Sequence, residues 1–124
     1  MPEEPRRIMI VDDEERVRNL LLEYLSDFDE FSLFEAASGE QALELLRGRP
    51  ADLCVVDMRL PGMNGVSFIQ ASSEAGLCRK FLVHTGSVDF TLTPELASLG
   101  LGEADIFTKP ANAKDILLRI RAVT

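Results

Sequence analysis

The chain of 124 residues is long enough for one compact domain and too short for two. Its formal net charge of −8, from 21 acidic and 13 basic side chains, argues against direct binding to nucleic acid or to anionic membrane surfaces, because both carry negative charge. No apolar run approaches the roughly 18 residues needed to span a bilayer, and the polar, acidic residues 1–5 argue against a signal peptide.

Strand-like and helix-like segments alternate along the chain. Short, nearly continuous apolar runs are typical of strands that are buried on both faces. Apolar residues that recur every three or four positions are typical of helices that bury one face. In chain order, these patterns predict a strand at 7–11, a helix at 14–25, a strand at 31–36, a helix from 39 to about 48, a strand at 53–57, a helix from 66 to about 73, a strand at 81–85, a short helix from 94, a strand at 104–108 and a last helix from 113.

Three of the helices carry recognisable N-terminal signals. Ser38 is the expected N-cap of the second helix, with Gln41 three residues later as its capping-box partner. Thr93 is the expected N-cap of the fourth helix, followed by Pro94 at the first helical position, and Asn112 caps the last helix. The strict alternation predicts an α/β fold, a doubly wound (βα)₅ domain whose five-stranded parallel sheet has helices on both faces.

The cysteines and the single histidine are interpreted as structural residues. Cys54 and Cys78 show neither paired nor metal-ligand spacing, and Cys54 lies in an apolar run where a small core residue is expected. Free thiols are typical of a reducing compartment, so we expect a cytoplasmic protein. His84 is the penultimate residue of an apolar strand and is predicted to pack in the core rather than to act as a ligand or base.

Polar residues that could bind a ligand or take part in a reaction lie at the ends of four predicted strands. Asp12 and Asp13 follow the first strand, and Asp57, Thr85 and Lys109 end or follow the third, fourth and fifth. In open α/β sheets, ligands bind beyond the carboxyl ends of the strands, where the strand order reverses. In a sheet of order 2-1-3-4-5 the three carboxylates would share one pocket, which the hydroxyl and the ammonium approach from the other side.

These side chains suit a divalent cation and a phosphoryl group. Three neighbouring carboxylates repel one another unless a cation neutralises them, and Mg²⁺ prefers oxygen ligands. The metal, the Lys109 ammonium and the Thr85 hydroxyl could bind the oxygens of a phosphoryl group in transfer. One carboxylate is then the nucleophile, and Asp57 is the best candidate because it stands alone. Taken singly, each aspartate is equally well explained as a helix cap or turn residue, so the hypothesis depends on the joint pattern.

With these motifs the chain closely resembles the receiver domain of bacterial two-component response regulators, over roughly residues 6 to 122. The resemblance rests on four segments: IVDDE at 10–14, VVDMRLPGMNG at 55–65, HTG at 84–86 and FTKP at 107–110. It implies a flavodoxin-like sheet of order 2-1-3-4-5. The expected organisation is a disordered N-terminal tail at residues 1–5 and a receiver domain at residues 6–124.

The resemblance also implies a phosphorylatable switch rather than an enzyme that acts on other molecules. Such a domain catalyses only its own phosphorylation and dephosphorylation, receives its phosphoryl group from a sensor histidine kinase, a phosphotransfer protein or a small phosphodonor, and acts on an output partner that the sequence does not name. A cis peptide is implied between Lys109 and Pro110. The implied site residues are Asp57 as phosphoacceptor, Thr85 and Lys109 at the phosphoryl oxygens, and Asp12, Asp13, Asp57 and the backbone carbonyl of Arg59 as ligands of Mg²⁺.

Two features depart from the family's pattern. Members often carry an aromatic residue three positions before the lysine, where this chain has Ile106, and the aromatic Phe107 comes one residue later. A shift of one residue in a strand turns a side chain to the opposite face, so Phe107 is predicted to belong to the core. The segment 85–109 is also slightly longer than usual, and its helix is predicted to be short.

Three other functions are less consistent with these residues. A metal-dependent phosphatase with an aspartyl-phosphate intermediate would need a second carboxylate two residues after the nucleophile, and that position is Arg59. A degenerate receiver that serves only as a protein-interaction module would lack key residues, and all of them are present here. A nucleotide-binding module is disfavoured, because no glycine-rich phosphate loop follows the first strand.

Overall fold

The computed structural model describes residues 4–87 and 90–124, so residues 1–3 of the expected tail lie outside the described residues. The predicted alternation of strands and helices is confirmed. The elements are β1 (Arg6–Val11), α1 (Glu15–Ser26), β2 (Phe31–Ala36), α2 (Gly39–Gly48), β3 (Ala51–Val56), α3 (Gly65–Glu74), β4 (Cys78–Thr85), α4 (Pro94–Ser98), a 3₁₀ turn η1 (Glu103–Asp105), β5 (Ile106–Thr108) and α5 (Ala113–Val123). None of the helices in the described ranges is long and apolar enough to cross a membrane.

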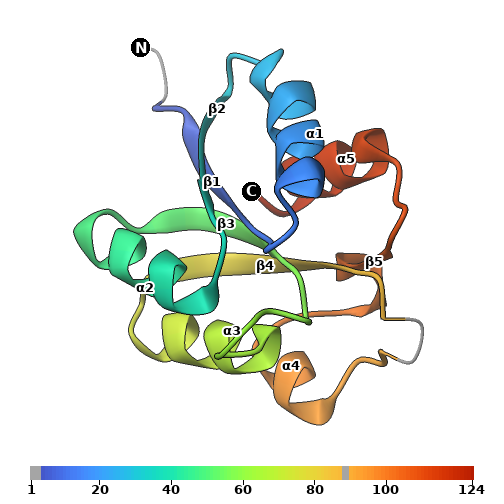
Figure 1. The fold of residues 1–124 in the computed structure, drawn as a ribbon. Helices are drawn as coiled ribbons and strands as arrows, with labels where there is room; N and C mark the ends of the chain where they lie inside the picture. The colour runs from blue at the N-terminus through green and yellow to red at the C-terminus, as the bar shows by residue number, and fades with distance from the viewer. Residues whose placement is uncertain (1–3, 88–89) are drawn as a thin grey trace.

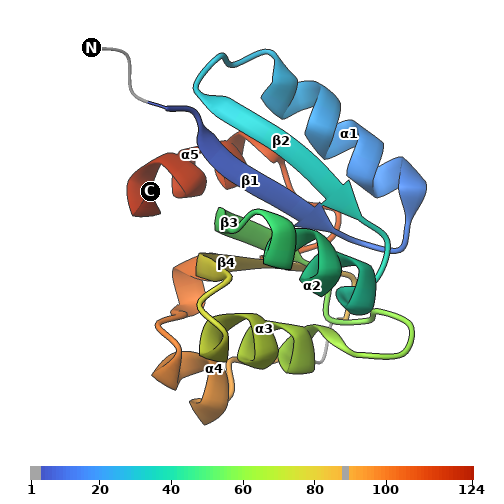
Figure 2. The ribbon, with the colours of Figure 1, turned by 90° about the vertical axis from the view of Figure 1, so that its left-hand side faces the viewer.

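The five strands form one parallel sheet of order β2-β1-β3-β4-β5, which confirms the predicted fold. Helices α1 and α5 cover one face, and α2, α3 and α4 cover the other, as Figures 1 and 2 show. The strand order reverses between β1 and β3, which are neighbours in the sheet. The carboxyl ends of these two strands therefore flank the point where ligands bind in such sheets.

Two apolar layers pack on the two faces of the sheet. Alternate residues of a strand point to opposite faces, so both layers draw on β1 and β3. The layer under α2, α3 and α4 includes Met9 and Cys54, and the layer under α1 and α5 includes Ile8 and Leu53. Burial on both faces explains why the strands are nearly continuous apolar runs, and the prediction that Cys54 is a core residue is confirmed.

Strands β4 and β5 differ most from their predicted bounds, and β3 begins at Ala51, two residues before its predicted start. β4 begins at Cys78 rather than at residue 81, because the charged residues that follow Cys78 are exposed and hide the strand pattern. β5 begins only at Ile106, because the carboxylate of Asp105 closes a turn instead. That carboxylate accepts the Gly102 N–H at 2.8 Å and pairs with Arg119 Nε at 2.8 Å.

The predicted caps are present, with one change in detail. The hydroxyl of Ser38 accepts the N–H of Gln41 at 3.1 Å, but the Gln41 side chain accepts the N–H of Ala37 at 2.7 Å, one residue outside the expected capping box. The side chains of Thr93 and Asn112 also accept N–H groups of their helices. Helix α4 is short, as predicted.

The two faces of β5 receive different residues. Ile106 packs against the layer under α2, α3 and α4, whereas Phe107 packs against the layer under α1 and α5. The ring of Phe107 turns to the opposite face, as predicted, but it is partly buried and packs against the core rather than within it. The aliphatic Ile106 therefore occupies the position where the family often has a rotating ring.

Candidate functional site

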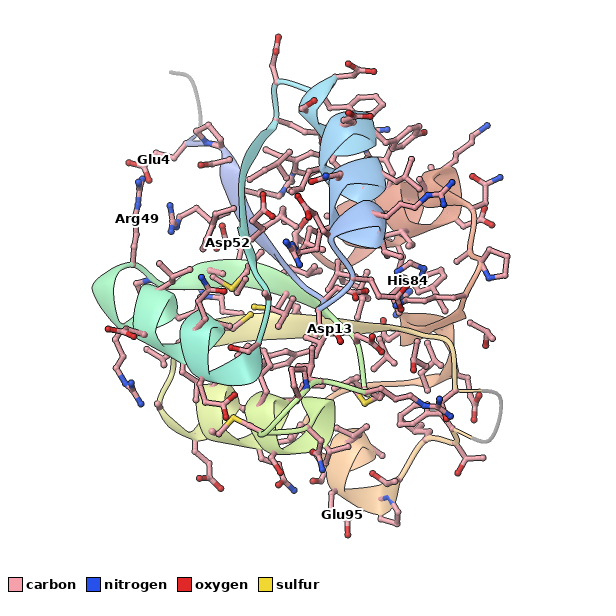
Figure 3. All side chains as sticks on the ribbon, viewed as in Figure 1. Glu4, Asp13, Arg49, Asp52, His84 and Glu95 are labelled. Carbon is pink, nitrogen blue, oxygen red and sulfur yellow. The ribbon has the colours of Figure 1, made fainter. Side chains whose placement is uncertain are left out.

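The acidic residues converge because backbone hydrogen bonds continue beyond the ends of the strands. The Asp57 N–H donates to the Val11 carbonyl at 2.9 Å, and the Asp12 N–H donates to the Ala36 carbonyl at 3.1 Å. Asp12 and Asp57 consequently lie side by side at the strand-order reversal, and both are almost fully buried. Asp13, next along the chain, is exposed. Figure 3 shows Asp13 and His84 toward one end of the strands and Glu4, Arg49 and Asp52 toward the other.

Lys109 neutralises part of this acidic cluster. Its Nζ lies 2.8 Å from Asp12 Oδ2, 3.2 Å from Asp57 Oδ2 and 3.1 Å from Glu14 Oε1. The Lys109 N–H donates to the Thr85 carbonyl at 2.7 Å, which anchors the residue beside the end of β4. The peptide between Lys109 and Pro110 is cis, as the resemblance implied.

The pKa values of Asp12 and Lys109 are both raised, although for different reasons. Burial raises the pKa of Asp12, and the hydrogen bonds from Lys109 and from the backbone of Glu14 only partly oppose that effect. Burial alone would lower the pKa of Lys109, but the carboxylates of Asp12, Asp57 and Glu14 outweigh it and raise that pKa. Lys109 is therefore a permanent ammonium.

The cluster has the donor set of a hard divalent cation. One ligand atom from each of Asp12, Asp13, Glu14 and Asp57 can be chosen so that all lie within 4.8 Å of one another. Among the residues that the structure describes, four carboxylates face one ammonium, so the site carries excess negative charge that a cation would offset. Mg²⁺ takes such all-oxygen sites and keeps several waters, which suits the exposed Asp13 and Glu14. The residues present therefore fit the predicted Mg²⁺.

The structure places Thr85 and Arg59 at the same edge of the sheet without testing their roles. Thr85 is fully buried, and its hydroxyl accepts the Ser87 N–H at 3.2 Å rather than meeting a site carboxylate. The Arg59 N–H donates to Asp57 Oδ1 at 3.2 Å, so the chain after β3 folds back over Asp57. The Arg59 carbonyl as a metal ligand stays a prediction.

Sequence reasoning gave no site role to Glu14 or Gly65. Glu14 was visible as the third consecutive acid of its motif, but its pairing with Lys109 joins residues 95 positions apart. Gly65 begins α3 against Asp57, since a Cβ at this position would lie 2.5 Å from the Asp57 carbonyl oxygen. A glycine next to the cap residue Asn64 was the only available signal for that close approach.

His84 is buried, as predicted, and neither of its ring nitrogens has a hydrogen-bond partner among the described residues. It borders a groove of about 890 Å³ that is mainly apolar and runs between α1 and the segment after β5. Burial is the main cause that lowers the pKa of His84 to about 4; Lys109 lowers it further, while Asp57 and Glu14 oppose. The ring is therefore neutral at physiological pH.

This neutral ring makes the stability of the domain depend on pH between about 6.5 and 4. In that window the unfolded chain binds a proton at His84 and the folded domain does not, so the free energy of unfolding falls as the pH falls. From the difference between 6.5 and about 4, the loss amounts to at most about 3 kcal/mol.

His84→Leu is expected to remove this part of the pH dependence. It should also raise stability at neutral pH by about 1 kcal/mol, because no ring nitrogen is left without a partner. Urea unfolding of both proteins between pH 7 and pH 4.5 measures the difference between their stability curves. Other titrating groups, such as Asp12, contribute equally to both curves and cancel in that difference. Parallel stability curves for the two proteins would contradict the prediction.

Comparisons with known proteins agree with the geometry. A family model described as the response regulator receiver domain matches residues 8–121. Response regulator GtcR of Aneurinibacillus migulanus is 29% identical over 117 residues, which cover 94% of this chain and 47% of that protein. Response regulator MprA of Mycobacterium sp. (strain KMS) is 31% identical over 119 residues, covering 96% of this chain and 50% of that protein.

Solved structures share the fold. The chemotaxis protein CheY4 of Vibrio cholerae has a TM-score of 0.81 and 22% sequence identity, with 97% of this chain and 99% of that chain covered. At this level of identity the likeness concerns the fold. The chain spans about half the length of the curated relatives it matches.

Proposed function

This chain belongs to the response regulator receiver domain family of two-component signalling, and we propose that its Asp57 accepts a phosphoryl group from a sensor histidine kinase or a phosphotransfer protein. The observation that carries the proposal is the buried Asp57 carboxylate, 3.2 Å from the Lys109 ammonium within a cluster of four carboxylates. A buried carboxylate with a fixed cation and a cation-binding cluster has the parts that phosphoryl transfer to aspartate needs.

The chain's own residues prepare the transfer. A carboxylate oxygen of Asp57 attacks phosphorus while the bond from phosphorus to the donor nitrogen breaks, and an acyl phosphate forms. The Lys109 ammonium, now shared among carboxylates, then has a phosphoryl oxygen as an additional partner. The Thr85 hydroxyl, at the end of the neighbouring strand, would donate to another. Mg²⁺, held by Asp12, Asp13, Asp57 and the Arg59 carbonyl, would supply further neutralisation of the developing charge.

The domain is proposed to act as a switch and not to turn over other substrates. Residue 59 is arginine, so the second carboxylate that a phosphatase of this type needs is not at that position. We propose that the receiver domain spans residues 6–124, acts in the cytoplasm and passes its signal to an output partner or output domain. An acidic net charge of −8 favours a protein partner over nucleic acid for the domain itself.

Incubation with acetyl phosphate tests the proposal directly. With Mg²⁺ we expect one phosphoryl group per chain by intact mass, and a retarded band on a phosphate-affinity gel. Chelation of Mg²⁺ should prevent labelling, and hydroxylamine should remove the label because it cleaves acyl phosphates. Lack of labelling at saturating donor would contradict the proposal, and steady turnover of a phosphomonoester would favour the phosphatase instead.

Arg59 and Ser87 are expected to tune the lifetime of the aspartyl phosphate. Their backbone N–H groups bind Asp57 Oδ1 and Thr85 Oγ1, so their side chains begin at the rim of the phosphoryl site. Replacing both by alanine should change the rate of autodephosphorylation several-fold, because the two side chains limit how water reaches phosphorus. Loss of label after donor removal measures the half-life, with the exposed Arg47→Ala on α2 as control. An unchanged half-life in the double variant would count against this role.

A further inference from the structure

Arg18, in the second turn of α1, joins three parts of the molecule. Its Nη1 donates to the backbone carbonyl of Asp12 at 2.7 Å, and its Nε donates to Glu35 Oε1 on β2 at 2.8 Å. The Arg18 side chain is only 12% exposed. Figure 2 shows α1 running beside β2, the arrangement that lets one side chain on the helix reach both the strand and the acidic loop.

The Asp12 carbonyl lies where the sheet ends. β1 pairs with β2 and β3 only as far as Val11, and beyond that point the Asp12 N–H still reaches the Ala36 carbonyl. The Asp12 carbonyl needs a donor of its own, because a buried carbonyl without a partner is costly. Arg18 supplies that donor, and the pairing with Glu35 fixes where the guanidinium lies.

This carbonyl belongs to the peptide that joins Asp12 to Asp13. The Asp12 carboxylate is held independently, since it accepts the Glu14 N–H at 2.9 Å and lies 2.8 Å from Lys109 Nζ. Asp13 is exposed, so the direction in which its side chain leaves the loop depends on the orientation of the peptide before it. We propose that Arg18 is a positioning residue that, braced by Glu35, turns the Asp12–Asp13 peptide so that the Asp13 carboxylate faces the cation.

The inference rests on the proposed function. The direction in which the Mg²⁺ affinity changes when Arg18 is replaced distinguishes a positioning role from an effect of its charge. The guanidinium is a cation close to a cation site, so its charge alone disfavours Mg²⁺. If Arg18 acted only through charge, its removal would tighten Mg²⁺ binding. If it positions Asp13, its removal weakens binding in spite of the more favourable charge.

Calorimetric titration of the full chain with Mg²⁺ measures the effect. Arg18→Met should weaken Mg²⁺ binding about tenfold, the range found when partners that orient metal ligands are removed. Arg18→Lys should recover part of the loss, because one donor can still reach the Asp12 carbonyl. Arg16→Met, an exposed residue on the same helix, removes the same charge and should leave the affinity equal or slightly tighter.

A double-mutant cycle identifies the ligand through which Arg18 acts. In an Asp13→Asn background, Arg18→Met should change the Mg²⁺ affinity little, because the carboxylate that it orients is gone. Glu35→Met, at a side chain that is 45% exposed, removes the brace and keeps the test available if Arg18→Met does not fold. Its lost charge weakens Mg²⁺ binding in either background, so the brace is measured as the additional loss seen only when Asp13 is present.

The outcomes separate the two proposals. If a folded Arg18→Met protein binds Mg²⁺ as tightly as the wild type, or if the loss in Arg18→Met or Glu35→Met is the same with and without Asp13, the role of Arg18 is refuted. Labelling of Asp57 in the wild type would still stand in that case. If the wild type neither binds Mg²⁺ nor accepts a phosphoryl group, the proposed function fails, and the positioning role fails with it.

Discussion

Asp57→Asn is expected to abolish phosphorylation by acetyl phosphate and Mg²⁺, with no label above background. The amide has no carboxylate oxygen that could attack phosphorus, and no other site carboxylate has the same surroundings. Asp12 carries the close ion pair with Lys109, and Asp13 and Glu14 are exposed. Loss of labelling would therefore reflect the loss of the nucleophile.

The variant should remain folded, so the loss can be read as chemistry. An asparagine oxygen can still accept the Arg59 N–H, and Lys109 keeps Asp12 and Glu14 as partners. One negative charge fewer also reduces the repulsion in the cluster, so without Mg²⁺ the free energy of unfolding should stay equal or rise. Intact mass after donor treatment, together with urea unfolding, measures both quantities. Asp29→Asn, an exposed position just before β2, is the matched control and should label like the wild type. Stoichiometric labelling of Asp57→Asn would refute the assignment.

Lys109→Met is expected to lower the free energy of unfolding by about 3 kcal/mol in the absence of divalent cations, because removal of one partner leaves buried charges uncompensated. Asp12 and Asp57 are almost fully buried, and Lys109 lies within 3.2 Å of both. The aliphatic part of the side chain is preserved in methionine, so the effect reports the ammonium. The rate of labelling should fall as well, since the fixed cation at the phosphoryl site is gone.

Mg²⁺ should restore more stability to this variant than to the wild type. A bound ligand stabilises the folded state by an amount that grows with its affinity, and in the variant the metal no longer competes with the ammonium for the carboxylates. Urea unfolding with and without Mg²⁺ measures the effect, with the exposed Lys114→Met on α5 as control, expected within about 0.5 kcal/mol of the wild type. A Lys109→Met protein as stable as the wild type, with no added response to Mg²⁺, would show that the three ion pairs contribute little.

Local sequence signals predict that the acidic residues and Lys109 lie together at one edge of the sheet, and the structure places them there. Asp57 is recognisable because an apolar run stops at an acid, and parallel strands bring such ends to one edge. The strand order came from the resemblance to a family, since alternation alone does not determine which strands are neighbours. What local patterns missed depends on pairings far apart in the chain. Glu14 meets Lys109 across 95 positions, and Arg18 meets Glu35 across 17.

Fine geometry was the other limit of prediction. Asp105 belongs to a turn rather than to β5, and its carboxylate pairs with Arg119 on α5, which a local pattern does not reveal. The direction of the Thr85 hydroxyl, toward the Ser87 N–H, is a choice of rotamer that no residue pattern encodes. The close approach of α3 to the Asp57 carbonyl, which requires Gly65, likewise depends on packing that no residue pattern encodes.

The position of Lys109 just after the last strand has a consequence for biosynthesis. The carboxylates come from the first half of the chain, but the ammonium that neutralises them follows β5, which has only three residues and pairs with β4 alone. A chain emerging from the ribosome therefore exposes its acidic residues long before their internal counter-charge has been made. Until Lys109 is in place, the acidic residues depend on cations from the surrounding solution, such as Mg²⁺, for their counter-charge.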